Sequence, residues 1–134
     1  MKKDIEIPEV KNVTLAVARE KNVLNQDEWR VYLLNNNEFD LENTLVASRG
    51  YGEKNGEEQR TSTLRHFLET VPAKGSTVVE PIDPNVFHLN NEYWVSYYSG
   101  SQIYDKRFVF VPETICESNL VFIKELQKEG VLHS

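Results

Sequence analysis

The fold is decided by the segment Glu92–Val111, which reads EYWVSYYSGSQIYDKRFVFV around a central Gly100-Ser101 pair. A glycine in the first position of a two-residue loop is typical of a β-hairpin. If these two residues form the loop, the register of the two strands follows from counting outward. The predicted cross-strand pairs are Tyr98 with Ile103, Tyr97 with Tyr104, Trp94 with Arg107, and Tyr93 with Phe108.

The two faces of this hairpin differ in character, because side chains alternate along a strand. The face expected to lie in the core carries Tyr93, Val95, Tyr97, Tyr104, Phe108 and Phe110. The second hairpin face carries Trp94, Tyr98, Ile103, Val109 and Val111 beside Ser96, Asp105 and Arg107. It is too apolar for the solvent side of an antiparallel sheet, so we expect it to be covered. The cover is either a helix of the same chain, as for most aromatic faces, or another chain or ligand.

Length and cysteine content describe the class of protein. The 134 residues have the size of one domain, here 1–134, that folds without disulfides. A single cysteine, Cys116, favours a reducing compartment. The basic start Met1–Pro8 has no apolar run behind it, so neither a signal peptide nor a membrane span is predicted. We therefore expect a cytoplasmic protein without a membrane partner.

The net charge of −6 comes from 15 basic and 21 acidic residues. An acidic chain is repelled by a phosphate backbone, so nucleic acid is not an expected partner. A local basic patch remains open, because Arg60, Arg65, His66 and Lys74 follow one another with only Glu69 among them. The simpler interpretation is the solvated side of a helix.

Alternating apolar and polar residues predict several strands outside the hairpin. They lie at Val13–Glu20, Glu28–Asn35, Thr44–Tyr51 and Ser76–Ile82, with a brief extended piece at Val86–Leu89. The run 35–37 is three asparagines, which tolerate turn conformations and should end the second of these strands. The glycine-containing segment 50–56 is expected to be an exposed hairpin loop.

Two further segments are predicted to be helices. Leu64, Phe67, Leu68 and Val71 have amphipathic spacing, which predicts a helix from Ser62 to Val71. Thr61 or Ser62 is its expected N-cap, and Pro72–Gly75 should end it. The buried stripe would include Phe67, so its truncation to alanine should cost about 3 to 5 kcal/mol.

The second helix is predicted from Ile115 to Glu129. Thr114 and Glu117 have the spacing of a capping box, and Gly130 would be the glycine cap at the carboxyl end. The expected fold is therefore an α+β domain. It has one mainly antiparallel sheet of five to seven strands, with both helices on one face. The order also suggests a βββα pseudo-repeat, in which Trp29–Leu34 corresponds to Trp94–Tyr98.

The sequence predicts no catalytic residue, no metal site and no cofactor. The glycines of segment 50–56 have the spacing G-x-G-x-x-x-G with no helix directly after them, so the dinucleotide and P-loop fingerprints both fail. The histidines lack the spacing of metal ligands. They are His66, His88 and His133.

Two weaker chemical arrangements remain. Cys116 with a histidine could act as nucleophile and base, although a small buried residue explains it more simply. Arg65 and His66, with Glu69 nearby, could bind an anion or shuttle a proton, although ordinary pairing on a helix surface explains the same residues.

Four stretches of the chain carry a resemblance. They are the opening Met1–Pro8, the pair Arg65-His66, Leu89-Asn90-Asn91, and Asp105–Phe110. Along most of its length the chain resembles a group of short uncharacterised bacterial proteins, some of which carry the label phenylalanyl-tRNA synthetase alpha subunit. A class II synthetase core needs a long catalytic sheet and glycine- and arginine-bearing ATP motifs, and segment 50–54 lacks that pattern. The resemblance implies no active-site residue.

Two hypotheses of function follow. The favoured one is a non-catalytic binding or assembly module that binds a protein partner or a second copy through Trp94, Tyr98, Ile103 and Arg107. The alternative is a small enzyme or a nucleotide- or anion-binding protein, whose pocket would be formed by Arg49, Arg60, Arg65 and His66. One geometric question separates them: whether Arg65, His66 and the second hairpin face line the same cavity.

Overall fold

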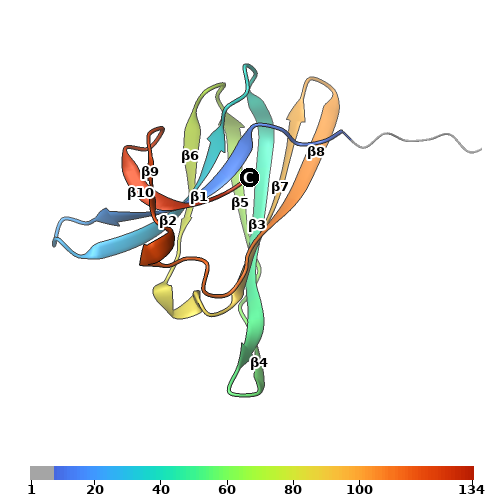
Figure 1. Cartoon of the computed structure of the whole chain (residues 1–134). Coiled ribbons are helices and arrows are strands. Elements are labelled where there is room, and N and C mark those ends of the chain that lie inside the picture. Colours follow the sequence, from blue (N-terminus) through green and yellow to red (C-terminus); the bar gives the residue numbers. More distant parts are fainter. Residues whose placement is uncertain (1–7) are drawn as a thin grey trace, which may run out of the picture.

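The computed structural model describes residues 8–134 and consists of two antiparallel β-sheets (Figure 1). The first sheet contains, in spatial order, β6 (Ser76–Pro81), β2 (Asp27–Asn35), β1 (Val13–Lys21), β10 (Lys128–His133) and β9 (Val121–Ile123). The second contains β4 (Glu57–Arg60), β3 (Leu41–Lys54), β7 (Asn90–Ser99) and β8 (Gln102–Phe110), and β5 (Leu64–Val71) also pairs with β3. Two short 3₁₀ turns are η1 (Pro84–Val86) and η2 (Glu117–Asn119).

The predicted α+β class is wrong. No α-helix occurs between residues 8 and 134, and the strands form two sheets instead of one. The described residues therefore also contain no helix long and apolar enough to cross a membrane. The amino-terminal segment that was expected to lack a signal peptide lies outside the described residues, apart from Pro8.

The central hairpin is confirmed. The pairing of β7 with β8 joins Tyr98 to Ile103, Tyr97 to Tyr104, Trp94 to Arg107 and Tyr93 to Phe108, as predicted. Gly100 has a φ of 62°, the left-handed conformation that favours glycine in such a turn. On the predicted core face, Tyr93, Val95, Tyr97, Phe108 and Phe110 are all buried, whereas Tyr104 is partly exposed.

The predicted strands near residues 13, 28, 44 and 76 are also confirmed, with small changes at their ends. β3 is longer than expected, because it continues to Lys54 and turns at Asn55-Gly56 into the charged strand β4. The exposed loop expected at 50–56 is therefore only the turn at Asn55-Gly56, because residues 50–54 belong to β3 and Gly50 is buried. The extended piece expected at Val86–Leu89 is instead the end of η1 and a turn.

The predicted first helix is a strand, β5, and a β-bulge explains the error. Leu64, His66 and Leu68 point inward with the period of two that a strand requires. Glu69 then has a φ of 60° at an irregularity of the pairing with β3, which shifts the alternation and returns Val71 to the core. The bulge therefore imitates helical spacing, and Phe67 lies on the exposed side.

The predicted second helix is wrong as well. Its residues form η2, β9, a turn and the start of β10, which pairs with β1. Cys116, not Thr114, precedes η2, and no side chain caps that turn. Without β10, one edge of β1 would have no strand partner. The backbone of this segment forms hydrogen bonds with that edge, which a helix could not do, so tertiary pairing overrides its helical pattern.

Gly130 is a close-approach glycine inside β10 and not a helix cap. A Cβ atom at this position would lie 2.6 Å from the carbonyl oxygen of Val17 and 2.6 Å from the side chain of Ile123. We expect Gly130→Ala to destabilise the fold by about 1 to 3 kcal/mol, measured by urea denaturation.

Asparagine at the same position separates the two interpretations. A helix cap accepts asparagine readily, so Gly130→Asn would then be the milder change. The tight contact with β1 predicts the opposite order, with asparagine more destabilising than alanine. A higher melting temperature for Gly130→Asn than for Gly130→Ala would contradict this packing.

The proposed βββα pseudo-repeat also fails. Its two matched segments belong to different sheets, because Trp29–Leu34 lies in β2 and Trp94–Tyr98 lies in β7. Neither is followed by a helix within the described chain.

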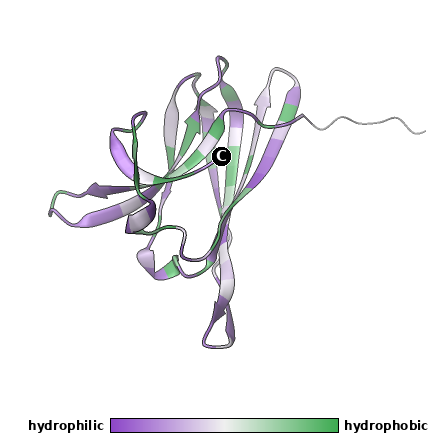
Figure 2. Ribbon diagram, viewed as in Figure 1, coloured by the Kyte–Doolittle hydropathy of each residue, from purple (hydrophilic) through white to green (hydrophobic). Residues whose placement is uncertain are grey.

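The core lies between the two sheets, and hydrophobic residues alternate with hydrophilic ones along the strands (Figure 2). The sheets are joined at one side by the turn at Pro72–Gly75, which connects β5 to β6. At the other side, the rings of Phe108 and Phe110 pack edge-on against His133 of β10, with centroids 5.5 Å apart in each pair. This arrangement leaves the outer face of the second sheet free of any covering element from the described residues.

Candidate functional site

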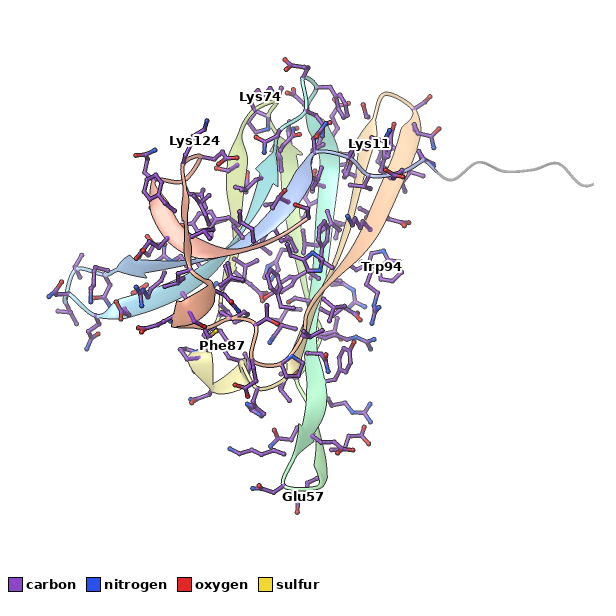
Figure 3. All side chains as sticks on the ribbon, viewed as in Figure 1. Lys11, Glu57, Lys74, Phe87, Trp94 and Lys124 are labelled. Carbon is purple, nitrogen blue, oxygen red and sulfur yellow. The ribbon has the colours of Figure 1, made fainter. Side chains whose placement is uncertain are left out.

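The outer face of the second sheet exposes a group of large apolar side chains. We call it the Trp94 face, and it comprises Leu45, Phe67, Trp94, Tyr98 and Ile103, which are 40 to 58% exposed. Figure 3 shows Trp94 pointing away from the body of the molecule. The cover that a helix of the same chain was expected to provide is absent from the described residues. A group of exposed apolar side chains on one sheet face is a candidate interaction surface.

The pairing of four strands orders this face into rows, because directly paired residues lie on the same side of a sheet. The first row runs Arg65, Ala47, Trp94, Arg107 across β5, β3, β7 and β8. The second row runs Phe67, Leu45, Ser96, Asp105. The third contains Glu42, Tyr98 and Ile103. The first row is therefore the basic end of the face, the second row is apolar on β5 and β3 and carries Asp105 on β8, and the third row, with Glu42, is the acidic end.

A buried carboxylate organises the basic end. The side chain of Glu92 is only 8% exposed and accepts hydrogen bonds from Nε of Arg49 at 2.9 Å and Nε of Arg107 at 2.7 Å. Burial alone would raise the pKa of Glu92, but the bonds from the two guanidinium groups lower it below its usual value. The bond to Glu92 likewise raises the pKa of Arg107. Arg107 also donates to the hydroxyl of Tyr51 at 2.9 Å, which fixes the guanidinium beside Trp94.

The five predicted site residues are divided between two sides of the sheet. Arg65, Trp94, Tyr98 and Arg107 share the outer face. His66 points the other way, since it follows Arg65 directly on β5, and its Nε2 lies 2.6 Å from Oε1 of Glu80. Arg65 and His66 therefore do not converge, and the proposed Arg/His pocket loses its central pair.

The remaining members of the basic patch also do not form an anion site. Arg49 and Arg60 line one small hollow with Thr61, but each guanidinium is already bonded to a carboxylate, Glu92 and Glu58 respectively. Lys74 lies elsewhere and pairs with Glu38. An incoming phosphate would have to compete with these carboxylates.

The space between the sheets contains a second polar centre, which the sequence did not predict. Glu80 of β6 has a side chain that is 10% exposed and lies at the wall of a cavity of about 330 Å³. Its Oε1 accepts hydrogen bonds from Ser48 Oγ at 2.8 Å and from His66 Nε2, and its Oε2 accepts one from the hydroxyl of Tyr93 at 3.0 Å. Burial, and then the carboxylate of Glu80, raise the pKa of Tyr93 far above its usual value, so the phenol stays protonated.

This centre does not have the geometry of a nucleophilic triad. Both Ser48 and His66 bond to Glu80, so the histidine does not act as a base toward the serine hydroxyl. Cys116 lies apart from it, with its sulfur 3.2 Å from the hydroxyl of Ser118. Within residues 8–134 no three His, Cys, Asp or Glu side chains come together as a metal site.

The sequence contains one signal for both carboxylates. Glu80 directly follows the apolar residue Val79, and Glu92 directly precedes the apolar residue Tyr93. A glutamate at such a position needs no partner when it is exposed, but it needs hydrogen-bond or ion-pair partners when it is buried. Their partners come from strands far apart in the chain. Only the sheet pairing brings them together.

Comparisons with known proteins leave the function to be argued from this geometry. No protein-family model, curated protein or solved structure matches the chain.

Proposed function

We propose that this protein is a non-catalytic, cytoplasmic binding and assembly module that pairs with a second copy of itself through the Trp94 face. The observation that carries the proposal is the exposure of Leu45, Phe67, Trp94, Tyr98 and Ile103 on one flat sheet face. Tryptophan, tyrosine and arginine are the residues that dominate interface energetics. This face combines all three around Trp94.

The pattern of charge favours a second copy over an unrelated partner. The first row, at the basic end, carries Arg65 and Arg107, the third row, at the acidic end, carries Glu42, and Asp105 lies in the row between them. A two-fold axis that lies in the plane between the two copies and runs parallel to the rows would place the basic end of each copy over the acidic end of the other, because a two-fold interface is made of the same patch on both subunits. Two sheets stacked in this way interdigitate their apolar side chains.

Charged side chains at the two ends are also available to form ion pairs with a second copy. Among the described residues, neither Arg65 nor Glu42 takes part in an ion pair. Arg107, by contrast, is held by Glu92 and Tyr51 beside the indole. A pre-positioned side chain loses little conformational entropy on binding, which favours association.

Trp94→Ala is the direct test. We expect the wild-type protein to sediment as a dimer at micromolar concentration, and the variant to dissociate with a dissociation constant raised about 30-fold or more, because truncated interface anchors cost about 2 kcal/mol or more. The melting temperature of the isolated variant should change little, since Trp94 is half exposed within the monomer. A wild-type protein that stays monomeric at high concentration would contradict pairing with a second copy.

Two phenylalanines supply a matched control. Phe67 lies on the Trp94 face and is 58% exposed, whereas Phe122 lies on β9 of the other sheet and is 62% exposed. Phe67→Ala should weaken the dimer and Phe122→Ala should not. Equal effects would show that loss of any exposed aromatic residue, and not this face, controls association.

Charge reversal tests the orientation of the two copies. Arg65→Glu should weaken the dimer, and the added change Glu42→Lys should restore it, because an axis parallel to the rows brings the Arg65 end of one copy over the Glu42 end of the other. A partner other than a second copy would not follow this pattern.

A further inference from the structure

We infer that the cavity beside Glu80 is a binding site for a small organic ammonium ion, such as a primary amine with a short apolar group. The site lies between the two sheets, on the opposite side of the second sheet from the Trp94 face. Its volume of about 330 Å³ is near the lower end of the range for small-molecule sites.

The polar end of this cavity offers hydrogen-bond acceptors. A carboxylate has about four acceptor positions, and three of those of Glu80 are used by Ser48, His66 and Tyr93. The one that remains is on Oε2. Because the hydroxyls of Ser48 and Tyr93 both donate to Glu80, each presents its own lone pairs to the cavity that it lines. A ligand group that donates several hydrogen bonds fits this arrangement.

The charge of the cavity favours a cation. The carboxylate of Glu80 is nine-tenths buried and is bonded by two neutral hydroxyls and a histidine nitrogen. Asp83 adds a second, exposed carboxylate to the lining. The guanidinium of Arg49, another lining residue, is held by Glu92 on the outer face and does not neutralise Glu80. Among the described residues, the ion-pair partner of Glu80 is His66, which carries a charge only when protonated, and an ammonium ion would supply the cation when that ring is neutral.

The rest of the wall is apolar and open to a ligand. Leu64, Ile82 and Val86 line the cavity beside its polar end. Leu64 is 51% exposed although it points to the inner side of β5, so the cavity communicates with solvent at this position. An apolar group attached to the ammonium would cover Leu64.

Benzylammonium is a suitable probe, and benzoate and benzyl alcohol are its anionic and neutral counterparts. Titration followed by backbone amide chemical shifts should show benzylammonium binding at residues around Leu64, Ile82 and Val86, with benzoate not binding. Glu80→Gln should weaken benzylammonium at least tenfold, because the negative charge that strengthens the hydrogen bond to the ammonium is removed, and should leave benzyl alcohol unchanged. Absence of benzylammonium binding, or equal binding of benzoate, would overturn the inference.

Three further variants make the test specific. Asp83→Asn removes the exposed carboxylate and should weaken the probe less than threefold, so a loss as large as that of Glu80→Gln would overturn the role of Glu80. Leu64→Trp fills the cavity from an exposed position and should abolish binding of benzylammonium. This variant tests the site also if Glu80→Gln folds poorly. Retained binding would show that the probe binds elsewhere and would overturn the inference. Trp94→Ala should bind benzylammonium like the wild type, whatever the outcome for dimerisation.

Discussion

Phe108→Ala is expected to lower the free energy of unfolding by about 3 to 5 kcal/mol, which is enough to unfold a large fraction of a domain of ordinary stability. Phe108 is completely buried between the sheets, and its ring packs against His133 of β10 at a centroid distance of 5.5 Å. Removing the ring leaves a cavity at the place where β8 of one sheet meets β10 of the other. Urea denaturation at low protein concentration, where association does not contribute, measures this change.

Phe67→Ala is the matched control for this prediction. It removes the same ring from an exposed position of β5, where Phe67 loses only its cross-strand contact with Leu45. Such a contact is worth about 0.2 to 1 kcal/mol. The sequence pattern alone predicted the large effect at Phe67, so equal destabilisation by the two substitutions would support the helix and contradict β5.

The hairpin could be predicted from the sequence because its information is local. Gly100-Ser101 sets the loop, the loop sets the register, and the register sets which face each side chain joins. The same counting correctly separated Trp94 and Tyr98 from Tyr93 and Tyr97. What could not be read locally was that no element of residues 8–134 covers the Trp94 face, because that depends on where the rest of the chain lies.

The two helices were predicted for a reason that the structure makes clear. Leu64 and Leu68 are four residues apart, which suits a helix and a strand equally, so the decision depended on Phe67 and Val71. Phe67 is apolar on an exposed face, and Val71 is brought inward by the bulge at Glu69. An exposed apolar side chain and a bulge together therefore imitated the 3.6-residue period, and neither can be recognised from a single sequence.

The part of the candidate site that lies in the hairpin was predicted, and the part that lies in β5 was not. Trp94, Tyr98 and Arg107 belong to the hairpin, and the structure places Arg65 in the same row through Ala47. His66 was placed with Arg65 because neighbours on a helix can share a face, whereas neighbours on a strand cannot. Once β5 is a strand, His66 must point to Glu80.

Asn35→Ala is expected to cost about 3 kcal/mol, although it removes only an amide group. Asn35 is completely buried at the end of β2. Its Nδ2 donates to the carbonyl oxygens of Phe39 at 2.9 Å, Pro72 at 3.1 Å and Val71 at 3.2 Å, while its Oδ1 accepts from the backbone N–H of Asn37 at 3.0 Å. One side chain thus ties β2 to the start of β3 and to the end of β5, so both sheets depend on it. Each buried backbone group left without a partner costs about 1 to 3 kcal/mol.

The neighbouring Asn36→Ala is the control, since it removes the same amide from a partly exposed position where its Nδ2 donates only to the exposed carboxylate of Glu125 at 3.2 Å. We expect a change within about 0.5 kcal/mol, as for other surface substitutions. The run 35–37 was predicted to end a strand because asparagine favours turns, and on that basis the two substitutions should be equivalent. A large difference between them in urea denaturation would show that Asn35 acts through its hydrogen bonds to distant strands, whereas equal small effects would mean that water satisfies those carbonyl groups when the amide is absent.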